Sequence, residues 1–202
     1  MKEIYLLRHG RTEYNAKGMV QGSGIDADLD NVGSEQALAF YNAYNHIRFD
    51  HIYISALKRT YQTVEKFIEA GIPYTKYEGL NEISWGNMEG LSANVLDKQH
   101  YLDTITAWKN GELHRAIGFG ESPLEVVERQ RPVIQEIIAA GGQDVIIICM
   151  HGRAMRILLS TLMNNPLSEM EMYEHANTGL YHLLYENDKF SILKDNCQLH
   201  LG

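Results

Sequence analysis

Residues 145–152 read Val-Ile-Ile-Ile-Cys-Met-His-Gly, and this stretch decides which fold class the sequence predicts. Its run of β-branched and apolar residues predicts a strand that is buried on both faces, as in a parallel sheet covered by helices. The strand ends at His151-Gly152, and a helical pattern follows to about Met163. A buried strand that passes directly into a helix is typical of α/β folds.

Strand-like and helix-like segments also alternate through the rest of the chain. Residues 3–7 predict a first strand, and residues 52–54 predict a second strand, after which Ser55 is expected to cap a helix. Asp30 is expected to cap a helix over residues 31–46, between these two strands. We therefore expect an α/β protein, a three-layer α/β/α sandwich with a mostly parallel central sheet.

Three further elements complete the expected fold. Residues 92–110 predict a helix capped by Ser92, and Ser122-Pro123-Leu124-Glu125 predicts the capped start of a helix that ends at Gly141-Gly142. Residues 178–185 and 190–194 predict a closing hairpin. A length of 202 residues suits one domain. We expect a single domain over residues 1–202, with residues 86–121 as a small helical cap insertion.

Composition argues against polyanionic partners. The chain has 26 acidic and 18 basic residues, and its formal net charge of −8 predicts no binding to nucleic acid or to an anionic membrane. The longest dense apolar run, residues 145–150, is too short to cross a bilayer. No signal peptide pattern precedes the first strand, and Cys149 and Cys197 suggest reduced thiols, so we expect a cytoplasmic location.

Three predicted strand-to-helix junctions carry residues that suit a phosphoryl group. The first strand ends at Arg8-His9, Arg59 lies in the first helical turn after the second strand, and His151 follows the strand over 145–150. In open α/β sheets, ligands collect at the carboxyl ends of the strands. If these strands are neighbours, the four side chains converge in one pocket.

These side chains suit phosphoryl transfer through a covalent intermediate. Arginine presents paired donors that match phosphate oxygens, and the helix that carries Arg59 adds its positive end. A neutral imidazole such as that of His9 can attack phosphorus. The departing alkoxide needs a proton. The candidate acid is Glu82, and the alternatives are Glu13, Glu89 and Glu121.

Five segments, taken in chain order, resemble the histidine phosphatase superfamily of phosphoglycerate-mutase-like proteins. They are Leu7–Thr12 followed by Asn15 and Gln21-Gly22, then Ser55–Thr63, Leu80–Ile83, Gly120–Ser122 and His151-Gly152. The resemblance implies that His9 is the nucleophile and that Glu82 is the proton donor. It also implies a phosphate pocket formed by Arg8, Arg59 and His151.

The resemblance also includes substrate-binding positions, and the sequence differs from the family pattern at a few other positions. Asn15 resembles a flanking phosphate ligand, and Gln21 and Gly22 are expected to contact substrate. Arg153 stands where a second glycine is frequent, and its side chain could reach the pocket or point to solvent. None of the departures falls on the five central positions.

Three functions fit these residues. The leading hypothesis is a histidine acid-type phosphatase that hydrolyses small phosphate monoesters through a phosphohistidine on His9. The runner-up is a phosphoglycerate mutase, for which we expect the cations of residues 86–121 to be too sparse to keep a bisphosphate away from water. The third is a non-catalytic phospho-ligand-binding module, which would need neither His9 nor Glu82. The other histidines show no paired ligand spacing, so we expect no metal and no cofactor.

Overall fold

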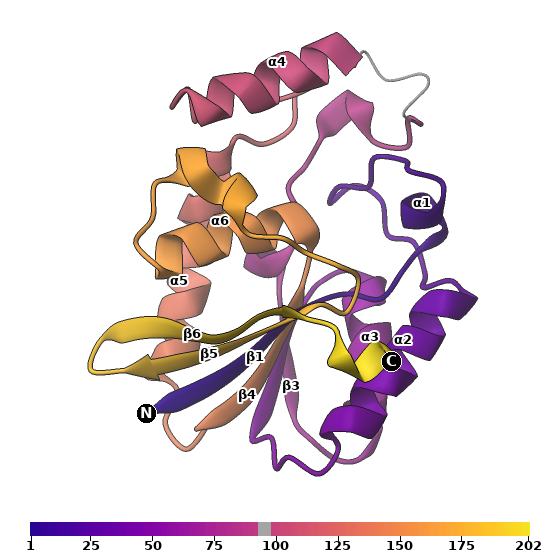
Figure 1. Cartoon of the computed structure of the whole chain (residues 1–202), viewed down its shortest axis with the longest axis vertical. Coiled ribbons are helices and arrows are strands. Elements are labelled where there is room, and N and C mark those ends of the chain that lie inside the picture. The colour runs from indigo at the N-terminus through magenta and orange to yellow at the C-terminus, as the bar shows by residue number, and fades with distance from the viewer. Residues whose placement is uncertain (93–97) are drawn as a thin grey trace.

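The computed structural model describes residues 1–92 and 98–202, and a six-stranded sheet forms its centre (Figure 1). The strand order is β3-β2-β4-β1-β5-β6. The strands are β1 (Lys2–Arg8), β2 (His51–Ser55), β3 (Tyr74–Tyr77), β4 (Val145–Met150), β5 (Leu180–Glu186) and β6 (Lys189–Cys197). The first four are parallel, whereas β5 and β6 form the predicted antiparallel hairpin beside β1. The mostly parallel α/β sheet is therefore confirmed.

Two hydrophobic cores cover the two faces of the sheet. Side chains alternate along β1, so that Ile4 and Leu6 join one core while Tyr5 and Leu7 join the other. The first core contains the buried faces of α5 (Pro123–Ala139) and α6 (Gly152–Leu162), and the second contains those of α2 (Asn31–Tyr44) and α3 (Lys58–Glu69). This arrangement makes three layers. Because α3 follows β2 and α6 follows β4, both helices start at the carboxyl ends of the parallel strands.

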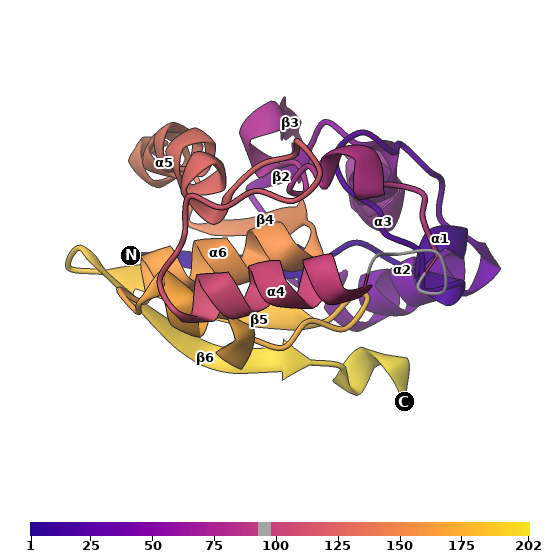
Figure 2. The ribbon, with the colours of Figure 1, turned by 90° about the horizontal axis from the view of Figure 1, so that it is seen from above.

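The remaining helices are short or lie outside the sheet layers. They are α1 (Glu13–Ala16), α4 (Lys98–Lys109) and the 3-10 helices η1 (Glu78–Leu80), η2 (Gly86–Met88), η3 (Leu167–Met172) and η4 (Leu199–Leu201). Seen from above, α4 runs over α6, and it contacts η3 (Figure 2). Trp108 of α4 is buried and joins the same core as α6. The segment expected to form a cap therefore packs on the α6 side of the molecule.

The structure confirms some of the predicted helix ends and corrects others. Asp30 accepts a hydrogen bond from the N–H of Gly33, and Ser122 forms the expected capping box. Ser55 does not cap α3: the helix begins after Leu57, without a side-chain cap. The hydroxyl of Ser55 instead contacts His151 at 2.8 Å. The same hydroxyl also accepts from the N–H of Leu57 at 3.2 Å, so Ser55 forms a local turn just before the helix rather than its cap.

The helix predicted over residues 92–110 is seen from Lys98 to Lys109. Ser92, its expected cap, forms an isolated β-bridge with Met19. The part of the prediction that falls on residues 93–97 lies outside the described residues. Other predicted boundaries also differ: α2 ends at Tyr44 rather than at residue 46, β2 begins at His51, β5 begins at Leu180, and β6 extends to Cys197.

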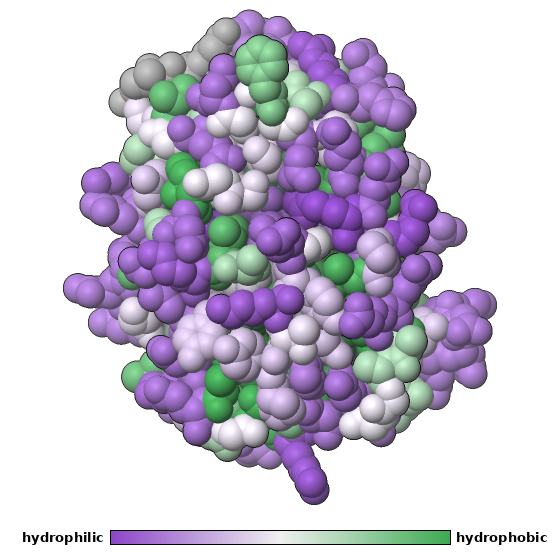
Figure 3. Space-filling model, turned by 180° about the vertical axis from the view of Figure 1, so that it is seen from behind, coloured by the Kyte–Doolittle hydropathy of each residue, from purple (hydrophilic) through white to green (hydrophobic). Residues whose placement is uncertain are grey.

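The surface seen from behind is mostly hydrophilic, with apolar side chains scattered over it (Figure 3). Within residues 1–92 and 98–202, no helix is both long enough and apolar enough to span a bilayer.

Candidate active site

His9 lies just beyond the carboxyl end of β1, and its ring is held in one tautomer. Its Nδ1 lies 2.7 Å from the carbonyl oxygen of Gly10, which can only accept, so Nδ1 carries the proton and Nε2 keeps a free lone pair. Only 3% of the residue is exposed. Burial, followed by the charges of Arg59 and Arg8, holds the pKa of His9 well below its usual value, so the ring is neutral at neutral pH.

His151 follows β4 and lies beside His9, with ring centroids 5.1 Å apart. Its Nδ1 accepts a hydrogen bond from Nε of Arg59 at 3.2 Å, and its Nε2 lies 2.8 Å from the hydroxyl of Ser55. Burial and the charge of Arg59 lower the pKa of His151 well below its usual value. Both ring nitrogens have partners within the protein. A phosphate could bind this ring only by taking the place of one of them.

Arg59 enters the site from the first turn of α3, and its side chain is fully buried. Besides His151, it donates to the carbonyl oxygens of Ile25 at 2.7 Å and Gly22 at 3.3 Å. These three bonds leave two of its five N–H groups for a ligand. Burial lowers the pKa of Arg59 to about 10, which still leaves the guanidinium charged at neutral pH.

Arg8 is the last residue of β1, and its side chain is held by His175. Its Nη1 donates to the carbonyl oxygen of His175 at 3.1 Å and lies 3.2 Å from Nδ1 of that ring. Its Nε is buried and has no partner among the described residues. Burial lowers the pKa of Arg8 to about 10, and the nearby charge of Glu82 opposes this shift. A buried donor without a partner, close to a second arginine, suits an anionic ligand.

Glu82 is buried to 7% exposure, and its carboxylate lies against the start of α6. Oε1 accepts from the N–H groups of Ile83 at 2.9 Å and Ala154 at 2.8 Å, while Oε2 accepts from that of Arg153 at 3.1 Å. Its charge acts on both Arg8 and Arg59. The structure thus brings Glu82 together with the predicted phosphate-binding residues.

The three alternative acids are engaged elsewhere. Glu13 forms an exposed pair with Lys17 on α1, and Glu121 forms a partly buried pair with Arg129. Glu89 accepts from the N–H of Trp85 at 3.0 Å, although its charge also reaches Arg59. Of these carboxylates, Glu82 alone acts electrostatically on both arginines of the site.

The predicted substrate-binding residues form one network next to His9. Asn15 belongs to a capping box with Thr12, and its Oδ1 accepts from Nδ2 of Asn177 at 3.1 Å. Gln21 accepts from the hydroxyl of Thr12 at 2.8 Å, which leaves its Nε2 buried and unpaired among the described residues. Gly22 reaches the site through its carbonyl oxygen, which holds Arg59. Gln21 therefore offers a donor to a ligand.

Sequence reasoning missed His175 and Asn177, which come from the loop before β5. Asn177 donates to the carbonyl oxygen of His9 at 3.0 Å, and burial lowers the pKa of His175 to about 3. The ring of His175 lies so close to Gly152 that a Cβ there would come within 2.8 Å of it. Neither residue lies at a predicted strand end, so only the fold reveals them.

Arg153 is buried, and its side chain turns toward the segment around α4. The residue is 8% exposed, and its guanidinium lies 5.9 Å from the ring centroid of Trp85 and 5.6 Å from that of Trp108. Glu171 forms ion pairs with both Arg153 and Arg156. The orientation that the sequence left open is therefore settled by packing against two neighbouring tryptophans and by the ion pair with Glu171.

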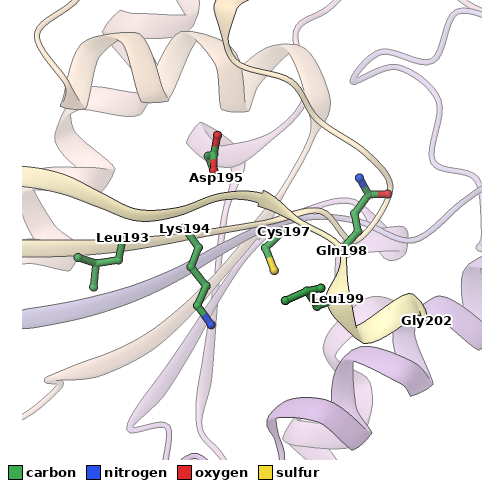
Figure 4. A pocket seen from close by; sticks show the side chains of 7 residues that line it. All are labelled: Leu193, Lys194, Asp195, Cys197, Gln198, Leu199 and Gly202. Carbon is green, nitrogen blue, oxygen red and sulfur yellow. The ribbon is translucent and has the colours of Figure 1, made fainter.

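Two observations concern other parts of the surface. Among the described residues, no group of three or more histidine, cysteine, aspartate or glutamate side chains could hold a metal ion. A pocket at the end of β6 is shown in Figure 4, and its lining includes none of the site residues. It is formed by Leu193, Lys194, Asp195, Cys197, Gln198, Leu199 and Gly202.

The sequence is similar to known phosphatases over nearly its whole length. A family model described as the histidine phosphatase superfamily (branch 1) matches residues 4–198. Phosphoserine phosphatase 1 of Hydrogenobacter thermophilus is 28% identical over 204 residues, covering 100% of this chain and 95% of that protein. The 6-phosphofructo-2-kinase/fructose-2,6-bisphosphatase of Gallus gallus is 32% identical over 171 residues, which are 84% of this chain and 34% of that protein.

Solved structures share the fold. A mycobacterial glucosyl-3-phosphoglycerate phosphatase in complex with VO3 has a TM-score of 0.86 at 25% identity, with 97% of this chain and 99% of that chain covered. The α-ribazole phosphatase of Shigella flexneri has a TM-score of 0.84 at 22% identity, with 97% and 96% covered. These similarities support a phosphatase function. Because the family match includes all the site residues described above, this chain belongs to branch 1 of the histidine phosphatase superfamily.

Proposed function

We propose that the chain is a histidine acid-type phosphatase that hydrolyses small phosphate monoesters without a metal or cofactor. One observation carries this proposal: the neutral ring of His9 exposes its Nε2 lone pair in a buried site next to the charges of Arg8 and Arg59. A neutral imidazole is a competent nucleophile toward phosphorus. The two guanidinium groups supply the positive charge that a phosphoryl group in transfer requires.

In the proposed first step, Nε2 of His9 forms a bond to phosphorus while the bond from phosphorus to the ester oxygen breaks. The departing alkoxide takes a proton from Glu82. Oε1 of Glu82 accepts two hydrogen bonds and Oε2 only one, so Oε2 is the oxygen that has room to carry the proton. In the second step, the Glu82 carboxylate takes a proton from water, the hydroxide attacks phosphorus, and the bond to Nε2 breaks.

Similar proteins suggest the class of substrate. Their names specify phosphoserine, glucosyl-3-phosphoglycerate and fructose 2,6-bisphosphate as substrates of those proteins. We therefore propose small soluble phosphorylated metabolites for this chain as well. A cytoplasmic location fits the two cysteines, which are both unpaired, and burial raises the pKa of the Cys149 thiol and keeps it protonated.

The decisive experiment is to trap the covalent intermediate. Enzyme mixed with labelled substrate and quenched in alkaline detergent should carry base-stable, acid-labile label on His9. His9→Ala should remove both the label and the turnover while it leaves the fold intact. Label on a serine, or activity of His9→Ala within about tenfold of wild type, would contradict the nucleophile assignment, because a lost nucleophile costs far more than that.

The alternatives are separated by their products. A phosphoglycerate mutase would convert 3-phosphoglycerate to its isomer in the presence of the bisphosphate, whereas a phosphatase releases inorganic phosphate from it. A non-catalytic module would bind phosphorylated ligands without releasing phosphate, even from 4-nitrophenyl phosphate.

A further inference from the structure

Arg129, on α5, places all five N–H groups of its guanidinium against acceptors. Nη1 donates to the carbonyl oxygens of Gly79 and Asn81, both at 2.9 Å, and Nη2 donates to that of Glu82 at 3.1 Å. The other two N–H groups, on Nε and Nη2, donate to Oε1 and Oε2 of Glu121 at 2.7 and 3.0 Å. An arginine has no further donors to give.

Glu121 extends this contact to the far end of the same loop. Its Oε2 also accepts from the N–H of Ser84 at 2.8 Å, and its own N–H donates to the carbonyl oxygen of Ser84 at 2.8 Å. At the near end, the loop lies directly on α5, since a Cβ on Gly79 would come within 2.5 Å of the carbonyl oxygen of Arg129. The pair Arg129–Glu121 therefore holds residues 79–84 at both ends and in the middle.

Glu82 lies in the middle of this loop and is held at two points. Its carbonyl oxygen is bound by Arg129 of α5, while its carboxylate is bound by the N–H groups at the start of α6. A proton donor must lie within hydrogen-bond reach of the leaving oxygen, and a displacement of about 1 Å can cost roughly 100-fold in rate. The position of the Glu82 main chain therefore affects the rate of proton transfer as well as the structure of the loop.

We propose that Arg129, paired with Glu121, is a positioning residue that holds Glu82 where its carboxyl meets the leaving oxygen. This inference rests on the proposed role of Glu82 as the acid. It assigns to Arg129 an effect on the proton transfers of Glu82 only, and in the phosphorylation step this is the transfer of a proton to the leaving group. A residue that merely supported the fold would affect all substrates alike.

Charge and geometry can be separated with a lysine. The charge of Arg129 also contributes, after burial and the nearer cations, to lowering the pKa of His151. Arg129→Lys keeps this charge but offers three donors in place of a planar set of five. If geometry is what Arg129 supplies, the lysine variant should behave like Arg129→Gln rather than like wild type.

The experiment measures single-turnover phosphorylation rates with two substrates, glycerol 3-phosphate and 4-nitrophenyl phosphate. The alkoxide of the first leaves badly without a proton, whereas nitrophenolate leaves almost unaided. Arg129→Gln and Arg129→Lys should lose about 10–100-fold with the alkyl phosphate and no more than about threefold with the aryl phosphate. The matched control is Arg131→Gln, because Arg131 lies on the same helix with an exposed side chain, and it should behave like wild type.

Combining variants makes the test specific to Glu82. Glu82→Gln alone should show the selective loss, and Arg129→Gln added to it should cause no further selective loss, because there is no longer an acid to position. Glu121→Gln should show the same selectivity with a smaller loss, and it keeps the test open if Arg129→Gln does not fold.

Two results would overturn the inference, and they differ from each other. Equal losses on both substrates in the Arg129 variants, with a selective loss in Glu82→Gln, would mean that Arg129 only supports the fold. Equal losses in Glu82→Gln itself would remove the acid role of Glu82, and the inference about Arg129 would fall with it.

Discussion

Arg59 donates its Nε hydrogen to Nδ1 of His151 across 3.2 Å, in the buried centre of the site. A guanidinium can only donate, so this bond requires an unprotonated Nδ1 and places the ring proton on Nε2. Protonation of Nδ1 would break the bond and set two cations against each other. Arg59 therefore keeps its neighbour neutral while two of its remaining N–H groups stay available for a phosphate.

Arg59→Ala should raise KM and lower kcat together, with kcat falling about 10²–10³-fold, because the same bonds hold phosphate in the ground state and the transition state. Arg59→Lys should recover only part of this activity, since a point charge cannot replace a planar fork. Steady-state kinetics on one alkyl phosphate measures both effects. Full recovery in the lysine variant would show that Arg59 contributes charge rather than geometry.

Glu82→Gln should slow phosphorylation by alkyl phosphates about 10²–10⁴-fold, the usual range for general acid catalysis, and phosphorylation by 4-nitrophenyl phosphate much less. With the aryl substrate, the variant should show a burst of nitrophenolate followed by slow turnover, because the lost carboxylate also activates the water of the second step. Rapid-quench burst kinetics resolves the two steps. If both substrates lose equally, Glu82 only positions substrate, and Glu89 becomes the next acid to test.

The free energy of unfolding should decrease as the pH falls below about 6.5. His9, His151 and His175 have lowered pKa values in the folded protein. As the pH falls, these rings become protonated in the unfolded chain before they do in the folded protein, and this favours unfolding. The contribution of these neutral rings to the free energy of unfolding is fully present above the pKa that histidine has in the unfolded chain. It is lost as the pH falls toward the pKa values of the rings in the folded protein. Each histidine should contribute at most about 2 kcal/mol of loss at pH 5.

Urea unfolding from pH 7 to pH 5 checks this dependence, in phosphate-free buffer, since a bound anion would favour the protonated rings. His175→Asn removes one of the three groups and should make the pH dependence shallower, whatever it does to the stability at pH 7. A stability that stays constant over this range would show that these rings take up protons in the folded protein.

Glu171→Gln should lower the free energy of unfolding by about 1–3 kcal/mol, because it leaves Arg153 and Arg156 without their shared, partly buried counter-charge. Burial alone would raise the pKa of Glu171, but the charges of Arg153 and Arg156 and the hydrogen bond from Arg153 together outweigh it, and the pKa is lowered. Urea unfolding at neutral pH measures the change. Glu169→Gln is the matched control, since Glu169 lies on the same 3-10 helix and is exposed, and it should change little.

Vanadate should inhibit competitively, and chelators should leave the activity unchanged. Vanadate can adopt the five-coordinate geometry of in-line transfer, and arginines can supply the charge stabilisation that metal ions supply in other phosphatases. Phosphate release measured with and without a chelator tests the second point. Recovery of lost activity by added Mg²⁺ or Zn²⁺ would contradict the proposed mechanism.

Much of the site was predictable because its residues lie at the ends of buried strands. Arg8, His9 and His151 directly follow or end strands that apolar composition marks clearly, and Arg59 lies in the first turn of a helix with regular periodicity. In a parallel sheet, such positions come together whatever the intervening sequence. The sheet order then places β4 between β1 and β2, so that the strand ends meet.

The parts that could not be predicted depend on contacts between distant segments. His175 meets Arg8 only because the loop before β5 crosses the end of β1, 167 positions away in sequence. Ser55 has the residue type of a helix cap, but α3 begins after Leu57, and the hydroxyl of Ser55 contacts the distant His151. The direction of Arg153 depends on two tryptophans that approach from another part of the chain. Local patterns carry no information on any of these.

The main chain and the side chain of Arg153 make contacts with different parts of the protein. The N–H group holds the carboxylate of Glu82, whereas the guanidinium lies over the rings of Trp85 and Trp108. Any residue except proline could supply the N–H group, because proline alone lacks it. Exchange of this side chain in protein engineering would therefore keep the N–H group that holds the proposed acid, while it removes one of the two ion pairs of Glu171. A library at this single position would vary the wall beneath α4 without removing the main-chain contact to Glu82.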